Sequence, residues 1–274
     1  MALPSIFMIQ CINLVLLFLY IGYYVERGDR GGFIMFTRRE SFKEFITNYP
    51  IVSIILLIHL LLYMVTTIPI FPNEYILEQT IGVNLYIVQG EWWRLITPIF
   101  IHSGFSHFLF NSFSIFLFGP ALELILGKAR FILLYLCTGI LANIATLLIE
   151  PLTYTHLGSS GAIFGLFGYY IALIVFRKDI ISKHNSQIIA TIAILSLIMT
   201  FIQPNINISA HLFGFLFGLI IGSFTQAKGK KILASYKEEL FRVKDSLSSR
   251  KKVPVKTIII WGILLLLAML GLFQ

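Results

Sequence analysis

The composition of this 274-residue chain excludes an ordinary soluble protein, because hydrophobic residues make up 57% of it and charged residues only 12%. A soluble domain is roughly a quarter charged, so lipid must be the solvent for much of this chain. The net charge of +8 does not indicate nucleic-acid binding, because the Lys and Arg residues lie in short links between apolar runs.

Apolar runs of the length needed to cross a bilayer, about 20 residues, divide the chain into predicted transmembrane helices. They lie near residues 51–70, 96–118, 131–149, 158–176, 188–203, 207–225 and 257–273. A further run, about 6–24, is interpreted as an extra span or an in-plane anchor, since it lacks the basic start and cleavage site of a signal peptide. The expected fold class is an all-α polytopic membrane protein.

The distribution of basic residues predicts which links face the cytoplasm. All of the 21 Lys and Arg residues except Arg94 lie in four links, namely 25–50, 119–130, 177–187 and 226–256. The links that face outward are then 71–95, 150–157 and 204–206. The segment 226–254 fits a basic amphipathic helix on anionic lipid as well as it fits a solvated linker.

A serine framed by glycines begins the run near 158–176. In Gly158-Ser159-Ser160-Gly161 the glycines let the backbone turn sharply and approach other groups closely. Free N–H groups at a helix start can also stabilise an oxyanion. Taken alone, the segment is explained better by a serine that caps the helix and glycines that allow close packing.

A histidine stands beside a stripe of small residues in the run near 207–225. The stripe, from Ala210 to Gly222, repeats every four positions and lets another helix approach almost backbone to backbone. Glycines after Ser160 offer a matching surface, so His211 is expected near Ser160. No aspartate accompanies the pair. The expected chemistry is a Ser–His dyad, in which imidazole takes the hydroxyl proton and later protonates the leaving amine.

Donors for an oxyanion are expected on the run near 96–118. His107 and Asn111 are four residues apart and share one helix face, and both neutral side chains donate hydrogen bonds. The alternative is a structural hydrogen bond between helices. Trp93 and Arg94 support the site or simply anchor the interface, since aromatic rings and snorkelling Arg prefer headgroup depth.

The other histidines carry less chemistry. His102 is interpreted as an architectural hydrogen bonder and His156 as a loop residue beside the Gly-Ser-Ser-Gly turn. His59 and His184 have no chemical companions and are assigned no role.

With these clusters in this order, the sequence resembles the rhomboid family of intramembrane serine proteases over about residues 35–226. The motifs that carry the resemblance are Trp93-Arg94, His107-x-x-x-Asn111, Gly119-Pro120-x-x-Glu123, Gly158-x-Ser160-Gly161 and Ala210-His211-x-x-Gly214-x-x-x-Gly218. Each motif alone is weak. All of them in family order, on the expected helices and the expected side of the membrane, are specific.

The resemblance implies a six-helix core holding a water-filled cavity open to the outside. Ser160 would be the nucleophile and His211 the general base. His107, Asn111 and the Ser160 amide would form the oxyanion hole. Glu123 would make a structural contact at the cytoplasmic end of the helix near 96–118. Implied substrates are membrane-spanning segments cut near their outer end, where small residues and helix-breaking sequence let the backbone unwind.

One residue departs from the bare pattern. Phe164, one turn after Ser160, stands where some family members carry a tyrosine that stacks on the catalytic imidazole. An aromatic stack survives this exchange, but a hydroxyl is lost.

The resemblance also divides the chain. An N-terminal hydrophobic segment with a basic link (1–34) precedes the six-helix catalytic core (35–226). A basic cytoplasmic linker (227–256) and an additional C-terminal transmembrane helix (257–274) follow. The short loops and the absence of a targeting presequence favour a bacterial plasma membrane.

Two other functions stay open at this point. A non-catalytic rhomboid-fold protein would bind membrane helices without cutting them, although such relatives usually lose the Ser or the His that this chain keeps. A small transporter would use buried His and Asn as ligands, but neither inverted repeats nor broken helices are visible.

The expected partners of the protease are transmembrane protein substrates and the bilayer, without nucleic acid. No cofactor or metal is expected, since Cys11 and Cys137 lie in apolar stretches without ligand spacing.

Overall fold

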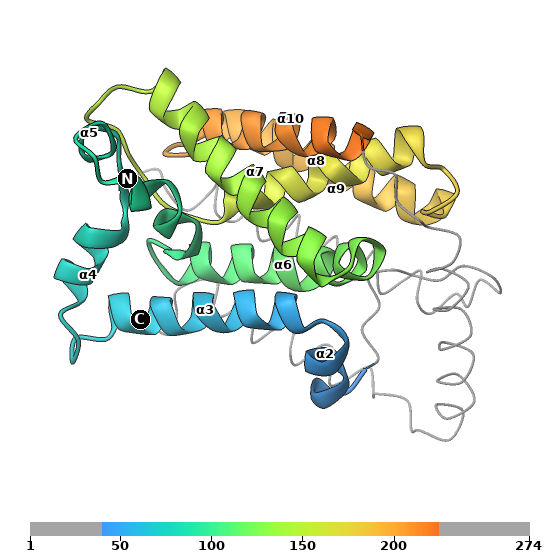
Figure 1. Ribbon diagram of the computed structural model, residues 1–274, viewed down its shortest axis with the longest axis horizontal. Coiled ribbons are helices and arrows are strands. Elements are labelled where there is room, and N and C mark those ends of the chain that lie inside the picture. The colour runs from blue at the N-terminus through green and yellow to red at the C-terminus, as the bar shows by residue number, and fades with distance from the viewer. Residues whose placement is uncertain (1–39, 225–274) are drawn as a thin grey trace. The chain divides into compact units, whose positions relative to one another are not determined.

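The computed structural model describes residues 40–224, which form the bundle of helices drawn in colour in Figure 1. The expected N-terminal segment (1–34), the basic linker (227–256) and the C-terminal helix (257–274) lie outside the described residues.

The described chain begins with a short helix that leads into a long one. α2 (Phe42–Asn48) starts at a capping box, in which Ser41 and Glu44 accept hydrogen bonds from each other's backbone N–H groups. These bonds satisfy donors that a helix start leaves open. α3 (Pro50–Thr67) carries a proline in its first turn, where the missing N–H costs nothing.

Short elements connect α3 to the next long helix. They are α4 (Asn73–Thr80), β1 (Gly82–Val83), α5 (Asn84–Val88), η1 (Trp92–Leu95) and η2 (Thr97–Phe100). Figure 1 shows α4 and α5 at the end of the bundle where α3 finishes, away from α2.

The predicted span near 96–118 is wrong at both ends. The observed helix, α6 (Phe105–Leu126), starts later because Pro98 lies in the 3-10 turn η2 and the residues up to Gly104 leave helical geometry. At the other end the helix stops at Gly127, whose φ of +79° favours glycine. Pro120 lies inside α6 and does not end it.

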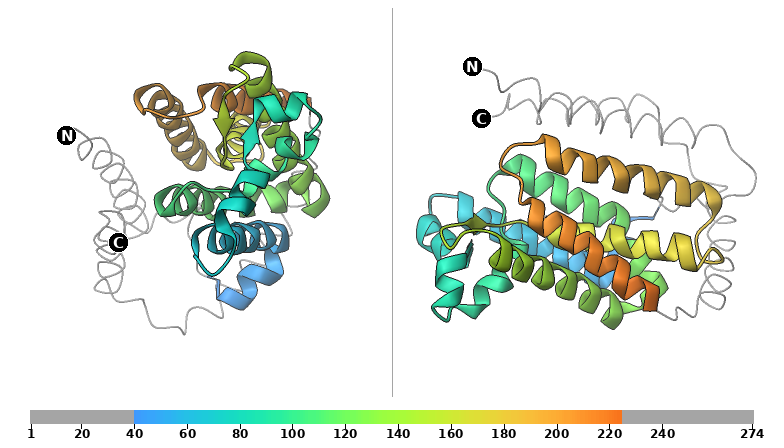
Figure 2. Two further views of the ribbon diagram at one scale, coloured as in Figure 1. Left: turned by 90° about the vertical axis from the view of Figure 1, so that its left-hand side faces the viewer. Right: turned by 90° about the horizontal axis from the view of Figure 1, so that it is seen from above.

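The remaining helices agree with the predicted spans. They are α7 (Lys128–Ile149), α8 (Ser160–Phe176), α9 (Lys183–Ile202) and α10 (Ile208–Phe224), and Figure 2 shows them from two further sides. Among the described helices, α3, α6, α7 and α9 are long and apolar enough to cross a membrane. α8 and α10 are apolar but shorter, with 17 residues each.

A small antiparallel sheet joins the link before α8 to the loop before α6. In it β2 (Thr155–His156) pairs with β1, so that Gly82 lies opposite His156 and Val83 opposite Thr155. A β-carbon at Gly82 would collide with the His156 ring. The absence of a side chain at Gly82 therefore lets the two loops meet.

α8 and α10 approach each other backbone to backbone. A β-carbon at Gly214 would overlap the carbonyl oxygen of Gly161, and one at Gly218 would overlap the carbonyl oxygen of Gly165. Helices in lipid gain little from the hydrophobic effect and rely on such close van der Waals contact. The glycine stripe predicted from the sequence thus lies in the contact between these two helices.

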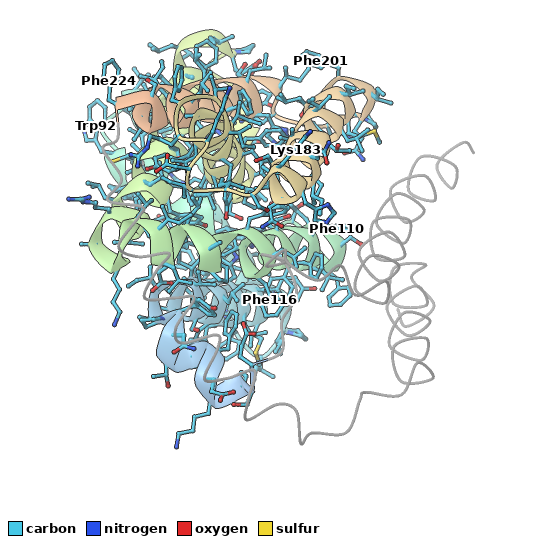
Figure 3. The ribbon with its side chains drawn as sticks, turned by 90° about the vertical axis from the view of Figure 1, so that its right-hand side faces the viewer. Trp92, Phe110, Phe116, Lys183, Phe201 and Phe224 are labelled. Carbon is cyan, nitrogen blue, oxygen red and sulfur yellow. The ribbon has the colours of Figure 1, made fainter. Side chains whose placement is uncertain are left out.

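Large apolar side chains cover the outside of the bundle. Figure 3 shows Phe201 and Phe224 projecting at its periphery, where they are 61% and 83% exposed. Such a surface suits lipid rather than water, since a soluble protein rarely exposes contiguous apolar patches.

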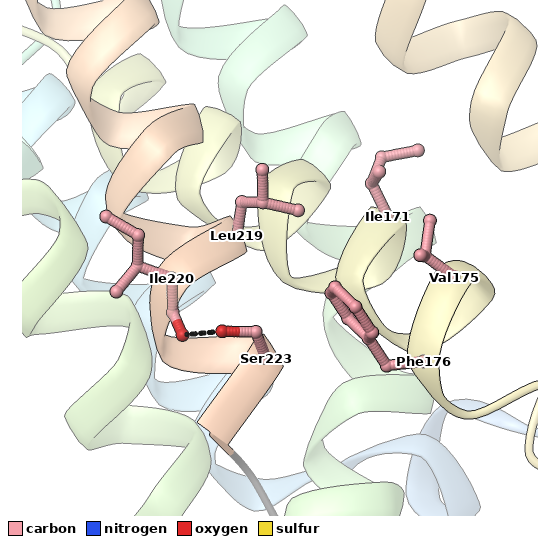
Figure 4. Close-up of a pocket in the computed structure, with 6 residues that line it drawn as sticks. All are labelled: Ile171, Val175, Phe176, Leu219, Ile220 and Ser223. Atoms are coloured by element: carbon pink, nitrogen blue, oxygen red, sulfur yellow. Dashed lines mark hydrogen bonds between the residues drawn. The ribbon is translucent and has the colours of Figure 1, made fainter.

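An apolar groove of about 390 Å³ lies between the C-terminal parts of α8 and α10 (Figure 4). It is lined by Ile171, Val175, Phe176, Leu219, Ile220 and Ser223. Its one hydroxyl, on Ser223, donates to the Ile220 carbonyl oxygen at 2.8 Å. The groove is therefore apolar and lies at the far ends of the two helices from Ser160 and His211.

Candidate active site

Ser160 is the first residue of α8, and its neighbour Ser159 is the N-cap. Ser159 is fully buried, whereas Ser160 is partly exposed. Gly158, with φ of +116°, makes the turn into the helix, and its N–H donates to the Pro98 carbonyl oxygen at 2.8 Å. The turn is thus fixed on η2, with Ser160 the more accessible of its two serines.

His107 and Asn111 lie beside this turn. The atoms closest to a β-carbon built on Gly158 are His107 Nε2 and Cε1, followed by Asn111 Nδ2. A side chain at Gly158 would therefore fill the space between the turn and the two donors. The other ring nitrogen of His107, Nδ1, lies 3.1 Å from the Ser103 hydroxyl, which orients the ring.

The amide nitrogen of Asn111 is buried and has no hydrogen-bond partner among the described residues. Buried polar groups are normally paired, so a donor without a partner requires an explanation. At this position the amide can donate to an acceptor bound against Gly158.

His211 lies in the first turn of α10 and is held from two sides. Its ring stacks on Phe164 of α8, with centroids 4.1 Å apart and planes inclined by 23°. Its Nδ1 lies 2.9 Å from the hydroxyl of Thr200 in α9. Ala210, the preceding residue, is in van der Waals reach of a β-carbon at Gly161.

Arg94 is not the snorkelling interface anchor that its position in the sequence allows. Its side chain is 1% exposed and donates to the carboxylate of Glu91 at 2.5 Å and to the carbonyl oxygens of Glu78 and Ile81 at 2.6 and 2.8 Å. Trp93, by contrast, is 48% exposed. Arg94 therefore joins the C-terminal end of α4 to η1 from inside the loop.

Glu123 lies at the other end of α6 and caps α3. Its carboxylate accepts the backbone N–H groups of Ile51 and Val52 at 3.0 and 2.9 Å. These are open donors of the first turn of α3, and a negative charge there is favoured by the helix dipole. Gly119, in the same motif, faces Val52 so closely that a β-carbon would collide with it.

Several histidines form contacts that the sequence does not predict. His59 has no expected role, yet its Nδ1 and Nε2 lie 3.3 Å from the hydroxyls of Ser112 and Tyr135. The His59 ring also contacts His102, and His102 contacts His107, with centroids 4.6 and 5.2 Å apart. The partners of His59 come from distant parts of the chain, so no local pattern reveals its contacts.

His156, expected as a loop residue, lies in the short strand β2 and is buried. It is 7% exposed and lies against Gly82. Burial lowers its pKa from 6.5 to about 4, because an apolar environment disfavours the charged ring. The ring is therefore neutral at pH 7.

Comparison with known proteins decides the family. The rhomboid domain matches residues 89–228. The rhomboid-family protein YdcA of Bacillus subtilis (strain 168) is 49% identical over 187 residues, covering 68% of this chain and 94% of that protein. The chain belongs to the rhomboid family.

More distant rhomboid relatives share shorter stretches. Rhomboid protease GluP of Bacillus subtilis (strain 168) is 35% identical over 157 residues, covering 56% of this chain and 31% of that protein. RHOMBOID-like protein 5 of Arabidopsis thaliana is 32% identical over 138 residues, covering 50% of this chain and 45% of that protein. As a family member, the chain is a multi-pass membrane protein and a serine peptidase of the rhomboid type.

Proposed function

We propose that this chain is an intramembrane serine endopeptidase that cleaves transmembrane segments of membrane proteins, with residues 35–226 as its six-helix catalytic core. The observation that carries the proposal is the position of the turn from Gly158 to Gly161. One end of it adjoins His107 and Asn111, and the other adjoins the α10 backbone next to His211. A nucleophile in this turn has donors on one side and a base on the other.

In the proposed reaction Ser160 Oγ attacks the carbonyl carbon of the scissile peptide while Nε2 of His211 takes the hydroxyl proton. The carbon–nitrogen bond then breaks, and the imidazolium gives its proton to the leaving amine. Water attacks the acyl-enzyme with the same base, which releases the new carboxyl end and restores Ser160. Stacking on Phe164 holds the imidazole plane through both steps.

The developing negative charge on the substrate oxygen needs donors that are already in place. His107 Nε2 and Asn111 Nδ2 adjoin the turn, and the Ser160 amide is one of the open N–H groups at the start of α8. These three groups form the proposed oxyanion hole. Gly158 keeps the space between them free.

The proposed location is a bacterial plasma membrane, with the active site opening to the extracytoplasmic side. The relatives from Bacillus subtilis support the first part. The links before α8 and α10, 150–157 and 204–206, hold no Lys or Arg, which supports the second by the positive-inside rule.

The test uses purified chain in liposomes with a reporter protein that carries one transmembrane segment. Ser160→Ala and His211→Ala should each abolish cleavage, and a fluorophosphonate probe should label the unmodified chain but not Ser160→Ala. Ser159→Ala is the matched control, because that serine is buried and should leave labelling intact.

Labelling or cleavage that persists in Ser160→Ala would contradict the assignment. A folded, unmodified chain that retains the reporter but neither cuts it nor reacts with the probe would instead be a non-catalytic binder of membrane helices.

A further inference from the structure

We propose that Thr200 of α9 is a positioning residue that sets the tautomer of His211, an inference that rests on the proposed function. A general base must present an unprotonated nitrogen to the serine hydroxyl. A neutral imidazole has one protonated and one unprotonated nitrogen. The hydrogen bond made by the nitrogen that does not face the serine decides which of the two carries the proton. In this chain that bond is made by Thr200.

The direction of the bond follows from the hydroxyl's second contact. Thr200 Oγ1 lies 3.0 Å from the Ser196 carbonyl oxygen and 2.9 Å from His211 Nδ1. A hydroxyl has one proton, and a carbonyl oxygen can only accept. The Thr200 proton is therefore donated to Ser196, one turn earlier in α9, as helical threonines commonly do. The Thr200 oxygen must then accept a hydrogen bond from the Nδ1–H group of His211.

This assignment leaves Nε2 of His211 unprotonated. Phe164 fixes the plane of the ring by stacking, and Thr200 fixes the rotation of the ring within that plane. Thr200 is 2% exposed and His211 7%, so water does not readily replace the threonine at Nδ1. The arrangement supplies the orientation that a carboxylate gives in a three-residue triad, with a neutral group instead.

The direct test reads the tautomer in the unmodified chain. Nitrogen-15 NMR of histidine-labelled protein, with the His211 signals identified by their loss in His211→Gln, should show Nδ1 protonated and Nε2 not. In Thr200→Val, which removes the hydroxyl at nearly constant shape, the signals should move toward the other tautomer. A protonated Nε2 in the unmodified chain would overturn the proposal.

Kinetics give the second readout. Thr200→Val should lower kcat for the reporter about tenfold to a hundredfold with KM little changed, since one hydrogen bond that aligns the base is lost. Thr200→Ser keeps the hydroxyl and should stay within about threefold of the unmodified chain, because the loss of one methyl group leaves the bond in place. Equal losses in the Val and Ser variants would show that the methyl group, and not the bond, matters, and would overturn the proposal.

Thr66→Val is the matched control for losing a buried helical hydroxyl. The Thr66 hydroxyl contacts carbonyl oxygens of its own helix, at Leu62 and Tyr63, and its loss should change neither kcat nor the His211 signals.

The role of Thr200 and the proposed function can fail independently of each other. Cleavage that survives Ser160→Ala removes Ser160 as the nucleophile but does not change the tautomer that the NMR measurement reports. A normal kcat and unshifted His211 signals in Thr200→Val would contradict the positioning role of Thr200 and leave the protease proposal intact.

Discussion

The buried amide of Asn111 is a hydrogen-bond donor that an acceptor bound at the turn would satisfy. Its nitrogen has no partner among the described residues, so its donor is free for an oxyanion. Asn111→Ala should lower kcat about 10²-fold to 10³-fold with little change in KM, as removal of one preorganised oxyanion donor does. Steady-state cleavage of the reporter in liposomes measures both constants.

Asn143→Ala is the matched control for Asn111. The Asn143 amide is also buried, but it donates to the Leu95 carbonyl oxygen at 2.9 Å. Its loss should lower the melting temperature rather than kcat. If Asn111→Ala also lowers the melting temperature but not kcat, Asn111 is a structural residue and does not belong to the oxyanion hole.

His156 should make the sheet before α8 sensitive to acid. Its pKa is lowered to about 4 in the folded chain against about 6.5 when unfolded, so the unfolded ring binds a proton first. The stability of the β1–β2 pairing is therefore complete above pH 6.5 and falls as the pH drops toward 4. One proton taken up on opening corresponds to roughly a tenfold rise in the opening equilibrium per pH unit.

Hydrogen exchange of the Asn84 amide, which donates to the Tyr154 carbonyl oxygen beside the β1–β2 pairing, tests this sensitivity between pH 7 and pH 4. His156→Phe keeps an aromatic ring against Gly82 and removes the titrating group, so it supplies the baseline. If the unmodified chain and His156→Phe show the same pH dependence, the ring does not carry it.

At the residue scale the sequence marks candidate residues for chemistry but does not show which side chains they contact. Ser160 and His211 stand out because polar residues in apolar runs are costly. Thr200 does not, since threonine is common in helices and its partner lies 11 residues away beyond a turn. The burial of Arg94 is equally hidden, because its partners include backbone carbonyl oxygens that no sequence pattern marks.

Among the long helices of residues 40–224, hydropathy predicts their number better than where each begins. The apolar run near 96–118 contains both η2 and most of α6. Hydropathy cannot separate them, because apolar 3-10 turns and apolar helices score alike. Pro98 and Gly104 mark the boundary, while Pro120, a more obvious helix breaker, lies inside α6. Proline is tolerated there because neighbouring groups in a membrane bundle can satisfy the freed carbonyl oxygen.

The contact between α8 and α10 should not accept side chains at its glycines. Gly218→Ala would place a methyl group on the Gly165 carbonyl oxygen and should lower the free energy of unfolding by about 1–3 kcal/mol or more, as overpacking does. Gly104→Ala is the control, because no atom lies within 4 Å of a β-carbon there. Thermal unfolding in detergent compares the two, and equal melting temperatures would contradict the close approach.

Over the whole described bundle, two buried charged side chains join elements at opposite ends. Glu123 joins the start of α3 to α6, and Arg94 joins the C-terminal end of α4 to η1. Both contact backbone groups, which gives each tie a fixed geometry whatever the neighbouring side chains are.

Arg94→Lys should loosen one end of the bundle although the charge is kept. The planar guanidinium reaches Glu91, Glu78 and Ile81 at once, which a single ammonium group on a flexible stem does not reproduce. A loss of about 1–3 kcal/mol is expected from unsatisfied buried acceptors. The melting temperature and the amide hydrogen exchange of residues near Glu78 and Ile81 measure this loss of stability. If neither changes in Arg94→Lys, the guanidinium geometry does not matter.

The backbone contact between α8 and α10 also limits how this protein can change. A clash between two side chains can be relieved by shrinking either one, so a second substitution can rescue the first. The carbonyl oxygens of Gly161 and Gly165 are present whatever residue carries them, so no exchange opposite Gly214 or Gly218 can make room. A screen for second-site suppressors of substitutions at these two glycines should therefore return only reversions, or changes that move a whole helix.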